Sequence, residues 1–248
     1  FKGDVKSENG HMVIDGKPIK VFSERNPANI PWNEVGAELV AEASGVFRSR
    51  EEVSAHMGET VKKVIITAPA KGDVDLTAVL GANENKYDSA NHHIISNASC
   101  TTNCFSMIVK VIHENFGIVK GQMTTVHSYT NDQQILDAPH KDLRRARAAA
   151  MSIIPTSTGA ASAIKLIFPE LEGKMSAVAM RVPTSDVSVI DFNCEVEKNT
   201  TAEEINEKFK EAANGELKGY LRYSDEELVS SDFIGDPHSA IFDAPLTS

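Results

Sequence analysis

The segment Ser99-Cys100-Thr101-Thr102-Asn103-Cys104 constrains the fold of this chain more than any other, because it joins a strand to a helix. The run His93–Ser96 before it has the apolar character of a short buried strand. After it, apolar residues recur with the i, i+3, i+4, i+7 spacing of one helix face, at Phe105, Ile108, Val109 and Ile112. With Ser99 as N-cap and Gly117 as the end, we predict a helix over 100–116 whose first turn contains Cys100.

The position of Cys100 favours a reactive thiol. At a helix start, unpaired backbone N–H groups and the helix dipole stabilise an anion, which lowers the pKa of a cysteine. Most free cysteines are buried and inert, but the hydroxyls around Cys100 make this helix start more polar than an N-cap requires. We interpret Cys100 as the candidate nucleophile, and Cys104, one turn later among apolar residues, as a packing residue.

A nucleophilic thiol needs a base, and His127 is the candidate. It lies near the end of Gly121–Thr130, a run rich in β-branched residues that predicts a strand. A helix, a short loop and a returning strand would bring this strand end back to the helix start. The pattern alone is compatible with a dehydrogenase, a thiol hydrolase or a structural histidine.

Composition narrows the class of protein. A net charge of −10 argues against nucleic acid and anionic membrane surfaces as general partners. Three cysteines without framework spacing suggest a reducing compartment, which favours a cytoplasmic protein. No apolar run approaches the roughly 18 residues of a membrane span, and we expect no metal site.

The first part of the chain has the pattern of a parallel sheet. Asn9-Gly10 and Asp15-Gly16 predict hairpins between short strands at the start of the chain. Ser49 and Glu52 form a capping box that opens a helix ending near Gly58. We expect buried strands at 38–43, 63–68, 79–82 and 93–96, as in the trailing half of a doubly wound nucleotide domain.

From about residue 99 the pattern is that of an α+β domain with a largely antiparallel sheet. We predict a strand at 121–129, a helix at 160–168, and strands at 175–182 and 187–196. The last two are joined by Thr184-Ser185-Asp186, which predicts that they pair antiparallel. Thr201 and Glu204 cap a helix that continues to about Ala213. We therefore divide the chain into domains at 1–98 and 99–248.

The intervening loop at 130–150 is long for a compact domain, so we expect it to be functional or disordered. Of its Arg144, Arg145 and Arg147, we expect two to be solvated or to contact another subunit. Arg181 differs, because it interrupts an apolar strand; it either faces water or anchors a phosphate near Cys100. Thr158-Gly159 opens a helix and is either an ordinary N-cap or a phosphate site.

Several motifs, in order along the whole chain, resemble those of the glyceraldehyde-3-phosphate dehydrogenases. The motif at 96–104 resembles their active-site signature, and 123–127 the segment with their catalytic histidine. Residues 139–150 are similar to the second half of their S-loop. The same order continues at 153–161, 179–184, 217–221 and 228–233.

The resemblance implies a Rossmann-type NAD-binding domain followed by a catalytic domain, in a homotetramer. It implies that Cys100 and His127 oxidise glyceraldehyde 3-phosphate through a thioester, which inorganic phosphate attacks. By resemblance, one phosphate site comprises Thr130, Asp132 and Arg181, and a second comprises Ser99, Thr101, Thr158 and Gly159. The residues that match the NAD groove are Ser44, Gly45, Thr67 and Asn131.

Against that family the sequence lacks two features. It contains no G-x-G-x-x-G motif for the cofactor pyrophosphate, and it lacks the family's later Asn-Glu segment, so we expect an internal portion of a longer protein that is inactive alone. Ala43 and Ser44 stand where many relatives have Ser and Thr, which keeps a hydroxyl at residue 44. The alternatives are a related dehydrogenase acting on erythrose 4-phosphate, or an inactive or binding protein on the same scaffold.

Overall fold

A computed structural model describes residues 2–248, and these form two compact units. The first unit contains the residues up to Leu76 together with Asp88–Asn97. The second contains Thr77–Tyr87 and Ala98–Ser248, so the short excursion at 77–87 clusters with the second unit. Phe1 lies outside the described residues.

An antiparallel meander opens the first unit. Its strands β1 (Val5–Glu8), β2 (His11–Ile14) and β3 (Lys17–Lys20) pair in chain order. Both predicted hairpin turns are confirmed: φ is 49° and 75° at Asn9 and Gly10, and 48° and 79° at Asp15 and Gly16. Two successive positive φ values give the turn twist that a two-residue hairpin requires.

A parallel sheet forms the core of the first unit. The strands β4 (Leu39–Glu42), β5 (Lys63–Ile66) and β7 (Ile94–Ser96) are parallel neighbours, and the short β6 (Leu76–Thr77) completes the order β4-β5-β7-β6. The predicted capping box is confirmed at α1 (Arg50–Ser54), where the Ser49 hydroxyl accepts from Glu52 N.

The strand predicted at 79–82 is wrong. The Asn83 side chain accepts a hydrogen bond from the backbone N–H of Val79 (2.7 Å), and Ala82 N donates to Val79 O (3.0 Å). These bonds close a turn instead, in which Gly81 has a positive φ of 86°. A short-range side-chain acceptor thus replaces the ladder partners that a strand would need.

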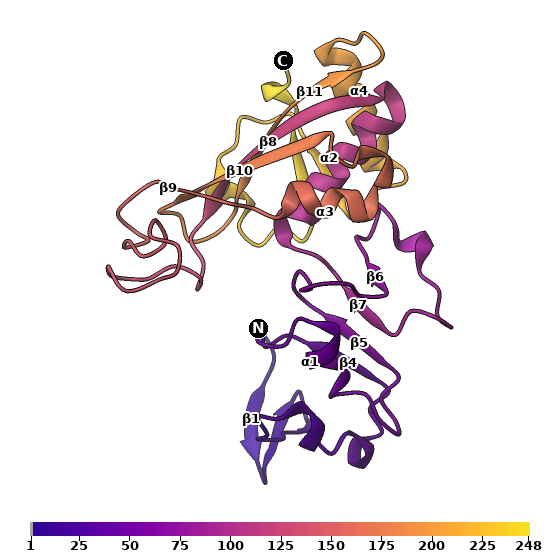
Figure 1. The fold of residues 1–248 in the computed structure, drawn as a ribbon, viewed down its shortest axis with the longest axis vertical. Helices are drawn as coiled ribbons and strands as arrows, with labels where there is room; N and C mark the ends of the chain where they lie inside the picture. Colours follow the sequence, from indigo (N-terminus) through magenta and orange to yellow (C-terminus); the bar gives the residue numbers. More distant parts are fainter. Residues whose placement is uncertain (1) are drawn as a thin grey trace. The chain divides into compact units, whose positions relative to one another are not determined.

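The second unit is a mixed sheet covered on one face by helices (Figure 1). Its strands β8 (Ile118–Ser128), β9 (Ile154–Thr156), β10 (Met175–Val182) and β11 (Val189–Val196) have the order β11-β8-β10-β9. The helices α2 (Cys100–Phe116), α3 (Ala160–Ile167) and α4 (Ala202–Asn214) bury a core around Phe105, Ile164 and Phe209. The predicted capping box of α4 at Thr201 and Glu204 is confirmed.

The predicted pairing of the two long strands β10 and β11 is wrong. They run in opposite directions, but β8 lies between them and pairs parallel with β10 and antiparallel with β11. The link 183–188 crosses the end of β8 and is therefore not a hairpin turn. With two antiparallel pairs and one parallel pair, the sheet is mainly antiparallel, as predicted.

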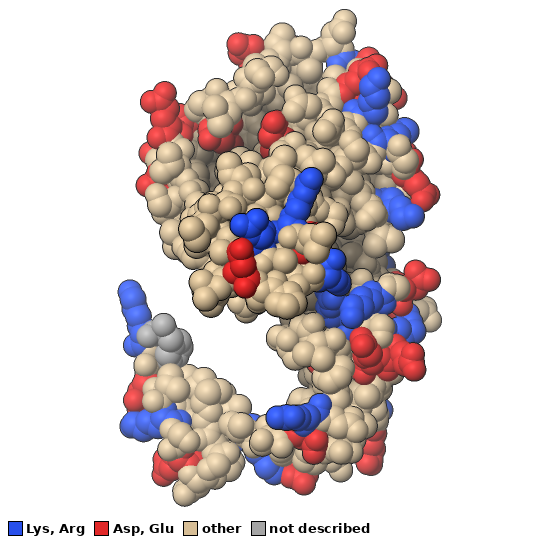
Figure 2. All heavy atoms as spheres, turned by 60° about the vertical axis from the view of Figure 1, so that its left-hand side comes forward, with Lys and Arg blue, Asp and Glu red and all other residues tan. Residues whose placement is uncertain are grey.

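Smaller elements complete the chain. Strands β12 (Leu221–Ser224) and β13 (Ala240–Asp243) form a parallel pair. Short 3₁₀ segments occupy Pro27–Asn29, Trp32–Val35, Glu84–Lys86, Pro169–Leu171, Ser230–Phe233 and Ala244–Leu246. None of the helices in the described part of the chain is both long and apolar enough to cross a membrane. On the face shown in Figure 2, basic and acidic side chains are interspersed.

Candidate active site

The helix α2 begins as the sequence predicts. The Ser99 hydroxyl accepts from Thr102 N (3.1 Å), and the Ser99 carbonyl accepts from Asn103 N (2.9 Å) and from the Asn103 side chain (3.0 Å). These bonds fix the first turn and place Cys100 as its first residue, at the end of the helix dipole that favours an anion.

The strand β8 brings His127 to this helix start. Met123, Thr125 and His127 alternate along the strand and are all buried, which places them on the face that the helices cover. Since β8 follows α2 directly and returns along it, the end of the strand meets the start of the helix. The Cys100 Sγ lies 3.6 Å from His127 Nε2, so the predicted pair is brought together.

The pKa values distinguish Cys100 from the other two cysteines. The hydrogen bond with His127 lowers the pKa of the Cys100 thiol to about 7, although partial burial opposes this shift. Burial raises the pKa of Cys104 to about 12 and also raises that of Cys194. Cys100 as a residue is more accessible to solvent than the other two cysteines, and it is the one cysteine of the chain whose pKa is lowered.

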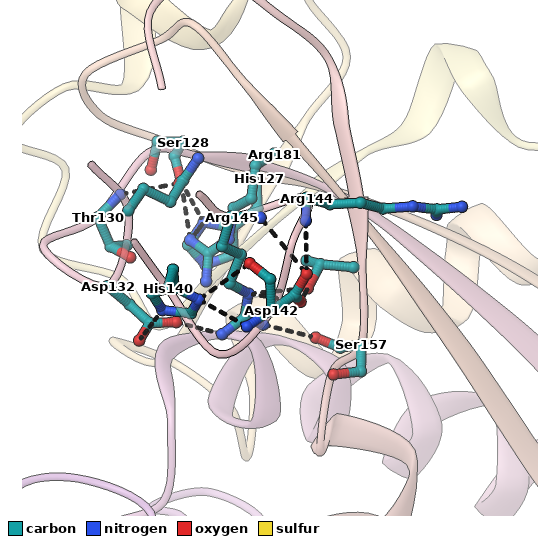
Figure 3. Close-up of polar contacts among 12 residues, drawn as sticks. His127, Ser128, Thr130, Asp132, His140, Asp142, Arg144, Arg145, Ser157 and Arg181 are labelled. Atoms are coloured by element: carbon teal, nitrogen blue, oxygen red, sulfur yellow. Dashed lines mark hydrogen bonds and ion pairs between the residues drawn. The ribbon is translucent and has the colours of Figure 1, made fainter. Parts of the chain in front are cut away.

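Strand register brings Arg181 to the same place. Arg181 on β10 is the parallel register partner of His127 on β8. Its Nη1 lies 2.7 Å from His127 Nδ1 and donates to the carbonyl of Ser128 (2.9 Å), as Figure 3 shows. The His127 Nδ1 also lies 2.7 Å from that carbonyl, which holds the imidazole in place. The Arg181 Nε is buried without a partner within the described chain.

The loop at 130–150 contributes a second guanidinium, which sequence reasoning left among three undifferentiated arginines. Arg145 forms an ion pair with Asp132 and donates to Thr156 Oγ1 (2.8 Å) and Ser157 O (3.2 Å). In Figure 3 the side chain of Arg144 points away from this cluster. Arg147 is exposed and pairs with Asp137, so two of the three arginines are at the surface, as expected.

The remaining predicted phosphate residues lie at helix starts and in the 130–150 loop of the second unit. Thr158 Oγ1 accepts from Ala160 N (3.2 Å) beside Gly159, at the start of α3. A Cβ atom on Gly159 would meet only Ser162 Oγ, at 3.9 Å, so the backbone there is open to close approach. Thr101 is buried in the first turn of α2, whereas the side chain of Asp132 contacts Arg145 and His140.

The predicted cofactor residues of the first unit lie after adjacent parallel strands. Ser44 and Gly45 follow β4, and Thr67 follows β5, at the carboxyl edge where doubly wound sheets bind nucleotides. Gly45 has a φ of 73°, and nothing lies within 4 Å of the position of a Cβ atom. Asn131, the fourth predicted residue, is exposed in the 130–150 loop of the second unit.

Sequence reasoning missed Glu42 and His56, which lie buried beside Ser44. The available signal was an acidic residue at the end of a strand, two residues before Ser44-Gly45. Among the described residues, no group of three His, Cys, Asp or Glu side chains is placed to hold a metal ion.

Comparison with known proteins places these residues in a family. The model of the C-terminal domain of glyceraldehyde 3-phosphate dehydrogenase matches residues 99–248, and that of the NAD binding domain matches residues 1–50. Proteins named glyceraldehyde-3-phosphate dehydrogenase are similar over the chain: one from Streptomyces coelicolor is 56% identical over 100% of this chain and 74% of its own length. One from Geobacillus stearothermophilus is 57% identical, over 98% and 72%.

Proposed function

Because the chain belongs to the glyceraldehyde-3-phosphate dehydrogenase family, we propose that Cys100 and His127 are the nucleophile and the base of the family's reaction. This reaction is the NAD-dependent oxidation and phosphorylation of glyceraldehyde 3-phosphate to 1,3-bisphosphoglycerate, a step of glycolysis. The contact of 3.6 Å between Cys100 Sγ and His127 Nε2, with a thiol pKa of about 7, is the observation that carries the assignment.

The chemistry of the two residues divides into three steps. The Cys100 thiolate attacks the aldehyde carbon, and the aldehyde oxygen takes the proton that His127 received from the thiol, which gives a hemithioacetal. His127 Nε2 takes the proton of its hydroxyl group while the hydrogen on carbon departs with its electron pair, which leaves a thioester. Bound NAD supplies the acceptor for that hydrogen and electron pair. Inorganic phosphate then attacks the thioester carbonyl, and Cys100 leaves as a thiolate.

Arg181 is the main anchor that we propose for the substrate phosphate. It is partly buried, it touches the catalytic histidine, and its guanidinium is a charged donor of the kind that binds phosphate oxygens. Thr130 stands two residues after Ser128 and joins this site in the proposal. Asp132 carries a negative charge and pairs with Arg145, so we assign it to holding that guanidinium rather than to donating to phosphate.

We assign the binding of the attacking phosphate to the N-termini of two helices. Ser99 and Thr101 lie at the N-terminus of α2, and Thr158 and Gly159 at that of α3. Backbone N–H groups and hydroxyls at such ends bind phosphate well, and the open backbone at Gly159 permits a close approach.

The NAD-binding residues that we propose fit a nucleotide. Ser44, Gly45 and Thr67 would hold the cofactor from the carboxyl edge of the parallel sheet. The open face of Gly45 supports this, since a bound ring or ribose would lie against a backbone that carries no side chain. Asn131 is assigned to the cofactor by the family resemblance alone.

Assembly and compartment complete the proposal. Exposed apolar side chains gather on the 130–153 segment, at Ile135, Leu136, Leu143, Met151 and Ile153, with exposed fractions of 68–88%. Isolated exposed residues are ordinary, but a group of this size in one segment is typical of a protein contact, and we assign it to a contact between copies in the homotetramer that the resemblance implies. The three free thiols support a reducing, cytoplasmic environment.

The test is an assay of NADH formation by the full-length protein with glyceraldehyde 3-phosphate and phosphate. We expect turnover that requires both, with a higher kcat/KM than for erythrose 4-phosphate, and its loss in the Cys100→Ser variant. A preference for erythrose 4-phosphate would overturn the assignment of the substrate. Turnover by Cys100→Ser would overturn the assignment of the nucleophile.

A further inference from the structure

Glu42 is an acidic residue inside the core of the first unit. Its exposed fraction is 6%, and that of His56 beside it is 5%. A carboxylate so far from water is costly unless its oxygens accept several hydrogen bonds. The partners of Glu42 therefore indicate what the residue is for.

The partners of Glu42 are the residues that we assign to the cofactor. One carboxylate oxygen, Oε1, accepts from the backbone N–H of Ser44 (2.8 Å) and from its hydroxyl (2.5 Å). The backbone carbonyl of Glu42 accepts from Thr67 N (3.0 Å) and Thr67 Oγ1 (3.1 Å). Glu42 thus holds residues that follow two adjacent strands, β4 and β5.

His56 holds the other end of the carboxylate. Its Nε2 lies 2.9 Å from Glu42 Oε2, and its ring packs beside Trp32 with ring centroids 5.8 Å apart. Burial opposes ionisation, but the hydrogen bonds from Ser44 and His56 together lower the pKa of Glu42, so the group is a carboxylate near neutral pH.

These bonds also set the direction of the Ser44 hydroxyl. Its hydrogen is donated to the Glu42 carboxylate, which can only accept, and its oxygen accepts from Val46 N (3.1 Å). The remaining lone pair of the Ser44 oxygen makes it an acceptor toward a ligand. It suits a ribose hydroxyl or a carboxamide N–H of the cofactor, and disfavours a phosphate oxygen.

We propose that Glu42, held by His56, is a positioning residue for NAD, which fixes the Ser44-Gly45 turn and presents the Ser44 oxygen as an acceptor. This inference rests on the proposed function, since that assigns Ser44, Gly45 and Thr67 to the cofactor. It adds two buried residues that touch neither substrate nor cofactor.

The test measures the Kd of NAD by calorimetry for variants of the full-length protein. Glu42→Leu removes the acceptor at similar size, and we expect the Kd to rise about tenfold or more. Glu42→Gln keeps one acceptor oxygen for Ser44, and we expect the Kd to stay within about threefold. Glu51→Leu, on the exposed face of α1, is the matched control. A Kd for folded Glu42→Leu within about twofold of the native value would overturn the inference.

Two measurements separate positioning from a general loss of structure. The alkylation rate of Cys100 without NAD reports folding of the second unit, and we expect it to be unchanged. In a Ser44→Ala background, Glu42→Leu should weaken NAD binding clearly less than it does in the native protein, because the hydroxyl that Glu42 orients is gone and only its bond to the backbone N–H of Ser44 remains. If the whole tenfold loss persists in that background, Glu42 acts on stability alone and the inference fails.

Further variants distinguish failure of the role of Glu42 from failure of the proposed function. If Glu42→Leu does not fold, Glu42→Asp, which keeps the charge but shortens the side chain, should raise the Kd about threefold, and an unchanged Kd there contradicts the inference. If Ser44→Ala itself leaves the Kd unchanged, the assignment of Ser44 to the cofactor fails, which is a failure of the proposed function. A loss in Ser44→Ala without a loss in Glu42→Leu overturns the role of Glu42 alone.

Discussion

At the scale of single residues, the reactivity of Cys100 comes from its place at a helix start and from its contact with His127. The sequence predicts the first more directly than the second. The helix start was predictable, because Ser99 and the apolar spacing after it define where the first turn lies. The contact with His127 Nε2 depends on how β8 returns along α2, and the sequence only suggested it. The lowered pKa of Cys100 combines both effects.

Alkylation by iodoacetamide tests the thiolate directly. Because the pKa of Cys100 is about 7, its alkylation rate should rise with pH through an inflection near pH 7 and level off above it. Cys104, with a pKa of about 12, should lag by at least about tenfold at neutral pH, as should Cys194. Peptide mass spectrometry identifies the labelled residue, and equal labelling of all three cysteines would refute the assignment.

His127→Asn tests the base. Hydride transfer should fall by roughly 10² to 10⁴, the usual effect of losing a general base. The inflection in the alkylation of Cys100 should move to higher pH, because the largest cause of its lowered pKa is gone. His11→Asn, in the meander of the first unit, is the matched control. Near-native turnover of His127→Asn would show that the base lies elsewhere.

At the scale of elements, capping boxes and hairpin turns were predictable because their signals are local. Ser49 with Glu52, Thr201 with Glu204, and the two Asn-Gly and Asp-Gly turns all formed as expected. Strand neighbours were not, because the sequence cannot show that β8 inserts between β10 and β11. That insertion also makes Arg181 the register partner of His127. The contact between these two side chains was therefore not predictable from the expected pairing of β10 with β11.

The half-buried carboxylate of Asp75, directly before β6, makes an acid-sensitive link to the start of β7. Burial would raise the pKa of Asp75, but hydrogen bonds from Ile94 N, Arg50 and His93 N lower it to about 2. Since the pKa is lower folded than unfolded, the stabilisation is present above about pH 4 and disappears as the pH falls toward 2. Asp75→Asn should therefore lower the free energy of unfolding by about 1–2 kcal/mol at neutral pH.

Trp32, the only tryptophan, packs against the core of the first unit, so its fluorescence during urea unfolding measures this difference. Asp73→Asn, at an exposed position two residues earlier, is the control. The difference in the free energy of unfolding between Asp75→Asn and the native protein should become smaller near pH 3. A difference of constant size at both pH values would contradict the assignment to ionised Asp75.

At the scale of the whole molecule, the order of motifs predicted the family and a nucleotide-binding part followed by a catalytic part. It did not predict that Thr77–Tyr87 clusters with the second unit, because this depends on contacts such as Lys86 Nζ with the carbonyl of Ile167 (2.9 Å). The apolar side chains on the 130–153 segment are another feature of this scale, since their exposure follows from the absence of packing partners within the described chain.

That segment predicts how assembly can be weakened. Leu143→Asp places a charge where we propose a contact between copies, and burying an unpaired charge is costly. Light scattering of the full-length protein should show the proposed tetramer shifting toward smaller species. Val229→Asp also replaces an exposed apolar side chain by a charged one, at a residue that is 64% exposed and lies outside this segment. This control should leave the oligomeric state unchanged. An unchanged tetramer in Leu143→Asp would exclude this segment from the interface.

A single-turnover experiment without phosphate tests the central claim, that Cys100 forms a thioester from glyceraldehyde 3-phosphate, most directly. Mixing the full-length protein with NAD and the aldehyde should give a burst of NADH that stops at about one equivalent per chain, because the thioester accumulates when nothing attacks it. Mass spectrometry should locate the acyl group on Cys100, and added phosphate should release it and restore turnover. A missing burst, or an acyl group on Cys104 or Cys194, would contradict the account.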